Sequence, residues 1–171
     1  MAIQGARTDN GQIAAHLIVK DVAEAIDFYR RALGAEESYR GEMPDGRVLH
    51  AQLRIANSFV LVSLENMGMD EETASRFSRG MRVRSPHTLN GTSAILELYV
   101  DDVDAAFRRA IEAGAMVKLP VEDMFYGDRY GMIEDPFGHV WALATVKETL
   151  PSRQIYERML AHFSGPVMEK C

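Results

Sequence analysis

The chain has 171 residues, a formal net charge of −6, and 47% hydrophobic and 26% charged residues, as in an ordinary soluble globular protein. The acidic balance and the lack of a basic block argue against nucleic-acid binding, and no apolar run approaches the ~20 residues that span a bilayer or forms the core of a signal peptide. The single cysteine is Cys171, so an internal disulfide is excluded and a reducing cytoplasm is the expected location.

The first part of the chain predicts a strand, a helix and two further strands. Residues 13–19 form the first predicted strand, and Asp21 is the expected N-cap of a helix that ends at Gly34. Apolar residues recur along this helix at the spacing of one face, which fits a helix lying on a sheet. Residues 46–55 then alternate between apolar and polar side chains, whereas residues 58–64 are more continuously apolar, as in a strand covered on both faces.

The second part of the chain follows the same plan. A strand at residues 94–100 precedes a helix with Asp102 as its N-cap, and strands follow at residues 129–134 and 139–146. The Asp-Pro-Phe-Gly sequence between these two strands is typical of a turn, because Pro restricts φ and Gly tolerates a positive φ.

Two further segments lie outside these two parts of the chain. Residues 66–92 are polar and long for a connection, so they form either a mobile lid or a loop with a short helix around residues 71–77. Residues 151–163 carry an apolar stripe at helical spacing. This stripe predicts a C-terminal helix that covers the sheet or docks on a partner subunit.

The two parts are an internal repeat. Residues 19–26 return in similar form as residues 100–107, 81 positions later, and each copy reaches a Gly-Ala pair about a dozen residues further on. Neither copy can bury its apolar faces alone, so the repeat predicts a paired architecture with a cleft built from equivalent positions in both copies.

Several short segments resemble a known family. Residues 25–29 (Ala-Ile-Asp-Phe-Tyr) and 135–141 (Asp-Pro-Phe-Gly-His-Val-Trp) resemble the vicinal-oxygen-chelate superfamily, which includes glyoxalase I, bleomycin-resistance proteins and extradiol dioxygenases. Residues 44–51 and 126–131 are similar to its PhnB-like branch. The resemblance implies an α+β fold of tandem βαβββ units around a U-shaped cleft.

The resemblance also implies the domain boundaries. One domain is expected at residues 12–147, with a first unit at 12–65, a connecting loop at 66–92 and a second unit at 93–147. A C-terminal helix at residues 150–164 follows this domain. Members of this superfamily catalyse several kinds of reaction or only bind ligands, so fold alone does not assign an activity.

In metal-dependent members, a divalent ion is held by side chains on the first and last strands of each unit, and Zn, Ni, Mn or Fe would suit such ligands. The 81-residue offset pairs His16 with Glu97, and both are suitable ligand types. At the other two positions, where relatives carry Glu, this chain has Leu61 and Ala142. We therefore expect no conventional metal site; if a metal binds, His50 or Glu65 is the substitute ligand.

His16 and Glu97 also have interpretations without a metal. His16 fits a hydrogen-bonded pocket or core residue, whereas Glu97 lies in an apolar strand and needs a partner or a wet cavity. If the two side chains face each other across the cleft, each would stabilise the other's charge, which raises the pKa of the histidine and lowers that of the glutamate. Such a pair would be structural or would serve in acid–base chemistry.

Arg129 is the remaining charged candidate for the cleft. With Asp128 it forms either an anion-binding pair or a salt bridge that fixes the neighbouring loop. Trp141 has the strand parity of a residue packed beneath the helix, and His139 is expected at the mouth of the cleft or on the surface.

The sequence thus predicts a protein that binds a small organic molecule, with no metal cofactor. One alternative is a metal-dependent lyase, isomerase or dioxygenase that uses His16 and Glu97, and another is an interaction module without a small ligand. A homodimer is expected because open sheets present edges that a second subunit covers; nucleic acid and membrane are not expected partners. The cleft candidates are His16, His50, Leu61, Glu97, Tyr99, Phe125, Tyr126, Arg129 and Ala142.

Overall fold

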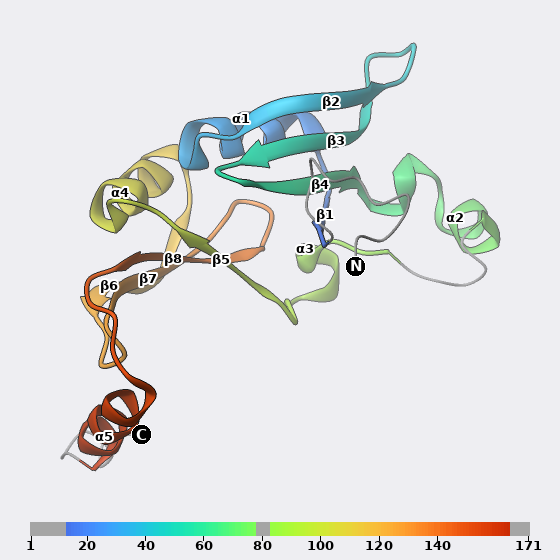
Figure 1. The fold of residues 1–171 in the computed structure, drawn as a ribbon. Coiled ribbons are helices and arrows are strands. Elements are labelled where there is room, and N and C mark those ends of the chain that lie inside the picture. Colours follow the sequence, from blue (N-terminus) through green and yellow to red (C-terminus); the bar gives the residue numbers. More distant parts are fainter. Residues whose placement is uncertain (1–12, 78–82, 165–171) are drawn as a thin grey trace, which may run out of the picture.

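The computed structural model describes residues 13–77 and 83–164, and it contains the two predicted copies (Figure 1). The elements of the first copy are β1 (Ala15–Val19), α1 (Val22–Leu33), β2 (Glu36–Glu42), β3 (Val48–Ile55) and β4 (Ser58–Leu64). Those of the second copy are β5 (Ile95–Tyr99), α4 (Val103–Ala113), β6 (Met116–Asp123), β7 (Asp128–Glu134) and β8 (Val140–Val146). Between them lie η1 (Glu65–Gly68), α2 (Glu71–Phe77) and α3 (Pro86–Leu89), and α5 (Ser152–Phe163) follows.

Each copy forms its own four-stranded mixed sheet. The strand order is β1-β4-β3-β2 in the first sheet and β5-β8-β7-β6 in the second. In both, the first strand runs parallel to the last and the other pairings are antiparallel. The prediction of an α+β fold made of two βαβββ units is confirmed.

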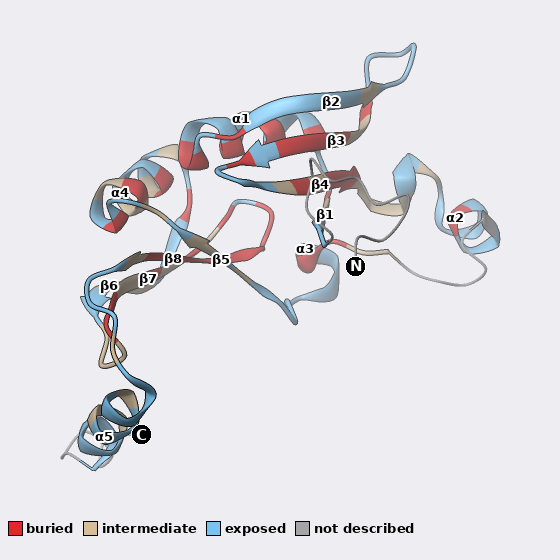
Figure 2. Cartoon of the chain, viewed as in Figure 1, coloured by how far each residue is buried: buried red, intermediate tan, exposed pale blue. Residues whose placement is uncertain are grey.

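The βαβββ plan includes a strand directly after each helix, but the residue pattern did not locate it. These strands are β2 and β6, and each forms an edge of its sheet. β2 reads Glu-Glu-Ser-Tyr-Arg-Gly-Glu and is almost entirely exposed, so it carries no apolar alternation. β6 contains Pro120, which an edge strand tolerates because its unpaired side needs no N–H donor. Figure 2 shows β2 as an exposed ribbon above the buried β3.

Both long helices begin and end where the sequence predicts. The side chain of Asp21 accepts a hydrogen bond from the backbone N–H of Glu24 at 2.9 Å, and Asp102 does the same for Ala105. At the other end of α1, Gly34 adopts a left-handed φ of 66°, a conformation that costs glycine little.

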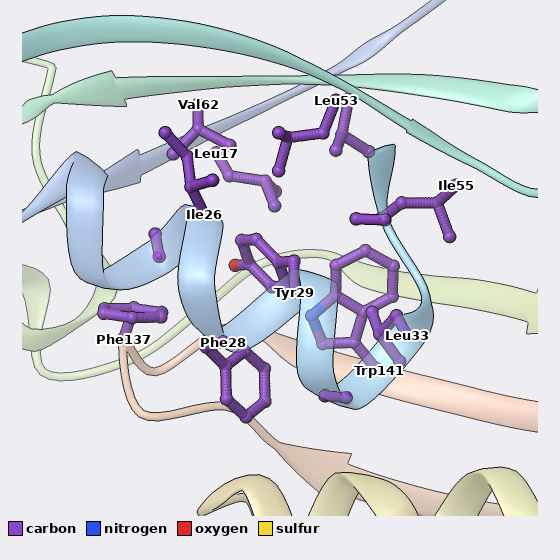
Figure 3. Packing of buried hydrophobic residues seen from close by; sticks show 14 of the residues in the cluster. Leu17, Ile26, Phe28, Tyr29, Leu33, Leu53, Ile55, Val62, Phe137 and Trp141 are labelled. Atoms are coloured by element: carbon purple, nitrogen blue, oxygen red, sulfur yellow. The ribbon is translucent and has the colours of Figure 1, made fainter. Parts of the chain in front are cut away.

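The two helices pack against each other and each covers one face of its own sheet (Figure 1). A single core therefore runs from the first sheet through α1 to Ile133, Trp141 and Leu143 of the second sheet. Figure 3 shows Phe28 and Tyr29 of α1 beside Phe137 and Trp141. Because both helices lie on these inner faces, the opposite face of each sheet is left open.

The turn between β7 and β8 joins the two units through Asp135, which is fully buried. One oxygen of its carboxylate accepts hydrogen bonds from the Tyr29 hydroxyl at 2.7 Å and the Trp141 indole N–H at 3.1 Å. The other accepts from the backbone N–H groups of Phe137 and His139, both at 2.9 Å. Burial and the adjacent carboxylate raise the pKa of Tyr29 well above its ordinary value, so the phenol remains a donor. We call this set the Asp135 network.

The predicted place of Trp141 beneath the helix is confirmed. Of the two predicted places of His139, the surface is wrong, whereas the mouth of the cleft agrees with its place in the wall of a cavity beside β1. His139 is buried, and its Nε2 lies 3.1 Å from the carbonyl oxygen of Ile18 in β1. A residue that follows a turn glycine usually lies on the surface, but this turn lies between the two units.

The two segments outside the copies form the predicted helices. α2 spans the expected residues 71–77, and α5 begins one residue after Pro151. α5 buries none of its described side chains and does not cover a sheet; Figure 1 shows it apart from both. None of the helices in residues 13–77 and 83–164 is long and apolar enough to cross a membrane.

Candidate functional site

The outward surface of the first sheet is called here the first open face. The strand register places His16 beside Leu61, and Ile18 beside Ser63. In turn, Ser63 lies beside His50. Since alternate residues of a strand point to opposite faces, these side chains share the face that α1 does not cover. The first open face comprises His16, Ile18, Tyr39, His50, Gln52, Leu61 and Ser63.

Two histidines on this face share one serine hydroxyl. The Ser63 Oγ lies 2.7 Å from Nε2 of His16 and 2.8 Å from Nδ1 of His50. The two imidazole rings meet edge to face, with centroids 5.8 Å apart. Tyr39 stands on the other side of His50, at a centroid distance of 6.0 Å. Three polar side chains from β1, β3 and β4 thus form one connected group.

The electrostatics of this group favour uncharged imidazoles. Partial burial lowers the pKa of His16, and the neighbouring His50 lowers it further. Burial also lowers the pKa of His50. Both rings are therefore neutral at pH 7. This is opposite to the raised histidine pKa that a His16–Glu97 pair would produce.

The corresponding surface of the second sheet, the second open face, is different in chemistry. Glu97 lies beside Ala142, and Tyr99 beside Ala144, which pairs with Tyr130. The second open face comprises Ile95, Glu97, Tyr99, Tyr126, Asp128, Tyr130, Met132, Ala142 and Ala144.

Phenol groups surround the carboxylates of this second face. Burial followed by the negative charge of Glu97 raises the pKa of Tyr99 and of Tyr130. Burial first and then Tyr130 raise the pKa of Tyr126 to about 12. The Tyr99 hydroxyl donates to Asp128 at 3.3 Å. These phenols stay protonated and act as donors at neutral pH.

His16 and Glu97 occupy equivalent positions, as the repeat predicts, but on the open faces of different sheets. No hydrogen bond or ion pair joins them within residues 13–77 and 83–164. The chain by itself does not bring the predicted pair together.

The donor set does not fit a conventional metal site. The strand neighbour of His16 at the second ligand position is Leu61, and that of Glu97 is Ala142, so neither can supply an oxygen. The proposed substitute Glu65 is already engaged, since its carboxylate accepts from Ser85 Oγ and Thr88 Oγ1, both at 2.7 Å. Over the part of the chain that the structure describes, no group of three or more His, Cys, Asp or Glu side chains could hold a metal ion.

Arg129 does not pair with Asp128. Its guanidinium binds Asp104 of α4 at 2.7 Å and Asp123 at 3.0 Å, because Arg129 points to the face of the second sheet that α4 covers. Arg129 thus forms a salt bridge, as one of the two interpretations predicted, but its partners are Asp104 and Asp123 and not Asp128. The side chain of Phe125 also lies outside the predicted cleft, because its ring packs against His162 and Phe163 of α5.

A cavity of about 300 Å³ opens beside His16, between β1 and β5. Its wall is mainly apolar. It is lined among others by His16, Ile18, Pro86, Leu89, Leu96 and His139. An organic molecule in this cavity would contact one member of the histidine–serine group directly.

Sequence reasoning missed Ser63 as a functional candidate. The signal was present, because Ser63 is two residues after Leu61 in the same predicted strand and must share its face. The closeness of His50 to His16 required the order of the strands, which the sequence does not state.

Comparisons with known proteins agree with the geometry. Residues 11–143 match the family model described as Glyoxalase/Bleomycin resistance protein/Dioxygenase superfamily. An uncharacterized protein of Mycobacterium bovis is 43% identical over 153 residues, which cover 90% of this chain and 95% of that one. Among solved structures, TioX from Micromonospora sp. ML1 has a TM-score of 0.59 and 25% identity, covering 78% of this chain and 97% of TioX.

A further solved structure is relevant to the metal question. FosX from Listeria monocytogenes, a fosfomycin resistance protein solved with Mn(II) and sulfate, has a TM-score of 0.54 and 19% identity. The alignment covers 87% of this chain and 97% of FosX. At this identity the likeness concerns the fold alone.

Proposed function

Because the chain belongs to the glyoxalase/bleomycin resistance protein/dioxygenase superfamily, we propose that it binds a small organic molecule at the first open face without a conventional metal centre. The observation that carries this proposal is the joining of His16, Ser63 and His50 into an uncharged polar group beside an apolar cavity. A concave apolar site with a few convergent polar groups is the common form of a small-molecule site. We also assign the chain to the PhnB-like branch and to the cytoplasm as parts of this proposal.

The alternative function is a metal-dependent lyase, isomerase or dioxygenase. FosX with Mn(II) shows that this fold can hold a metal in another protein. In this chain the alternative has fewer ligands to offer, because Leu61 and Ala142 replace two oxygen donors and Glu65 is bound to the loop after α2. We therefore favour the metal-free binder.

Two measurements separate these functions. Protein purified without chelator or affinity metal is examined by elemental analysis, and its thermal stability is followed with Zn, Ni, Mn or Fe and then with a library of uncharged aromatic fragments. A ligand that binds the folded state raises the apparent stability by RT ln(1 + [L]/Kd). We expect fragments to stabilise the wild type and lose this effect in His16→Ala. The exposed His162 of α5 provides a matched control, His162→Ala, which should respond like the wild type.

Near-stoichiometric metal that disappears in His16→Ala would contradict the proposal and support the enzyme. A library in which no fragment stabilises the protein would also count against it.

We further propose that the protein is a homodimer whose second copy covers the second open face. Ile95 and Tyr99 on this face are 57% and 54% exposed, an unusual state for large apolar side chains that lie together. Tyr99→Asp would place a charge in the dimer contact and should yield a monomer by size-exclusion chromatography with light scattering. Met67 is equally exposed at 54% but lies in η1, so Met67→Asp should remain dimeric. A wild type that is monomeric at all concentrations would refute this part.

A further inference from the structure

In the histidine–serine group (His16, Ser63 and His50), one hydroxyl contacts both imidazole rings. Ser63 is 9% exposed and its single hydroxyl lies within hydrogen-bond distance of one ring nitrogen of each histidine. Nε2 of His16 and Nδ1 of His50 face the serine. The opposite nitrogens, Nδ1 of His16 and Nε2 of His50, have no hydrogen-bond partner among the described residues.

The number of hydrogens in this group limits which of its ring nitrogens can be protonated. A hydroxyl has one hydrogen to donate, and a neutral imidazole carries a hydrogen on only one of its two nitrogens. If Ser63 donates to His50, then Nδ1 of His50 is bare and its Nε2 carries the hydrogen. Ser63 then accepts from Nε2 of His16, which leaves Nδ1 of His16 bare. If Ser63 donates to His16 instead, every assignment is reversed.

In both arrangements the outward nitrogens are unlike each other. One is a hydrogen-bond donor and the other an acceptor, and a change at one histidine reverses the other through Ser63. The neutral state that this requires is favoured because burial lowers the pKa of both histidines, and the neighbouring His50 lowers that of His16 further.

We propose that His16, Ser63 and His50 form a coupled pair of tautomers that recognises an uncharged ligand carrying both a donor and an acceptor, the chemistry of a cyclic amide. The proposal rests on the proposed function and names the ligand class for the same site. Leu61 and the apolar wall of the adjacent cavity suit the hydrocarbon part of such a ligand. Arg84 lines the same cavity, but Glu65 and Glu71 already pair with its guanidinium. An anion would therefore gain little charge compensation for its lost hydration. A ligand with only acceptors leaves the donor nitrogen unpaired, which costs binding energy.

The first experiment tests the coupling without any ligand. Nitrogen-15 NMR of the full chain at pH 7.5 identifies the protonated nitrogen of each of the five histidines. We expect the same tautomer at His16 and His50, with the hydrogen on Nε2 of both rings or on Nδ1 of both rings, in the wild type and in Ser63→Thr, which keeps the hydroxyl. In Ser63→Ala the two tautomers should become independent, while His87, His139 and His162 keep their signals. Opposite tautomers at the two histidines, or no change in Ser63→Ala, would overturn the proposal.

The second experiment tests the ligand class with a matched pair of probes. 2-Pyridone carries an amide N–H and a carbonyl, whereas N-methyl-2-pyridone lacks the donor and benzoate carries a charge. We expect 2-pyridone to bind about fivefold to tenfold more tightly than either, the value of one hydrogen bond. Ser63→Ala should remove this preference and Ser63→Thr should retain it.

Equal affinity for the two pyridones, or no binding of 2-pyridone at millimolar concentration, would overturn the ligand class. Binding of other organic fragments at His16 would then leave the proposed function standing. Conversely, matching tautomers without any fragment binding would support the coupling and contradict the proposed function.

Discussion

The two open faces belong to equivalent sheets of the repeat, yet their side chains differ in chemistry. In the core, equivalent positions keep their character: Val62 of β4 corresponds to Leu143 of β8, and both are fully buried. On the open faces, His16 corresponds to Glu97, and Ser63 to Ala144. One face gathers neutral imidazoles around a hydroxyl and the other gathers phenols around carboxylates. These buried positions thus carry the same kind of side chain in both copies, whereas the uncovered faces carry different chemistry.

The largest expected effect comes from removing the link between the two units. Asp135→Ala leaves the Tyr29 hydroxyl, the Trp141 indole N–H and two backbone N–H groups without their acceptor. We expect the free energy of unfolding to fall by about 3–5 kcal/mol, measured by urea denaturation.

Tyr29→Phe provides the graded control for this change, since it removes one hydrogen bond and should cost about 1–2 kcal/mol. A loss under 1 kcal/mol for Asp135→Ala would mean that the Asp135 network does not hold the units together.

A smaller loss of stability is expected from substitutions at two equivalent positions beneath the helices, Gly131 and Ala51. Gly131 of β7 pairs with Leu143, as Ala51 of β3 pairs with Val62. A Cβ at Gly131 would lie 2.9 Å from Val121 and 3.0 Å from Phe107 of α4, closer than a packed core accepts. Gly131→Ala should therefore cost about 1–3 kcal/mol.

The opposite change in the first copy, Ala51→Gly, should cost about 1 kcal/mol because it removes a buried methyl and loosens the strand. Both variants are compared by chemical denaturation. Stabilisation by Gly131→Ala would show that α4 moves away more easily than the structure indicates.

The smallest effect is a difference in pH response. His16 and His50 have lowered pKa values, so below pH ~6.5 the unfolded chain binds more protons. Stability from the first open face is thus present above this pH and is lost as pH falls. Tyr126 and Tyr130 have raised pKa values, so stability from the second face is lost as pH rises above ~10.

These two limits can be assigned by substitution. Thermal unfolding across pH should lose part of its acid sensitivity in His16→Gln/His50→Gln and part of its alkaline sensitivity in Tyr126→Phe/Tyr130→Phe. Identical pH curves for the variants and the wild type would show that neither face titrates as described.

Much of the fold was predictable because its signals are local. Asp21, Gly34 and Asp102 mark helix ends by capping chemistry that acts within one turn. The strands β2 and β6 were missed because edge strands need no buried side chains, so their sequences lack alternation. The burial of His139 was also missed, since it depends on contact with Ile18, more than a hundred residues away.

The site was less accessible to sequence reasoning than the fold. The repeat correctly placed His16 and Glu97 at equivalent positions, but equivalence does not state whether two faces meet. Arg129 was assigned to its neighbour in sequence, whereas its strand parity directs it to Asp104 on α4. Grouping His50 with Ser63 required the β3–β4 register, which arises from packing of the whole sheet.

The Asp135 network has a consequence for how such proteins are sorted. Tyr29, Asp135 and Trp141 belong to the segments in which this chain resembles the family, and all three are buried away from the open faces. In this chain these residues therefore determine how the two halves are joined and do not contact a ligand on either open face. Catalogues of function would separate better on the short row His16, Leu61 and Ser63 and its counterpart Glu97, Ala142 and Ala144, where a change leaves the architecture intact and rewrites the chemistry.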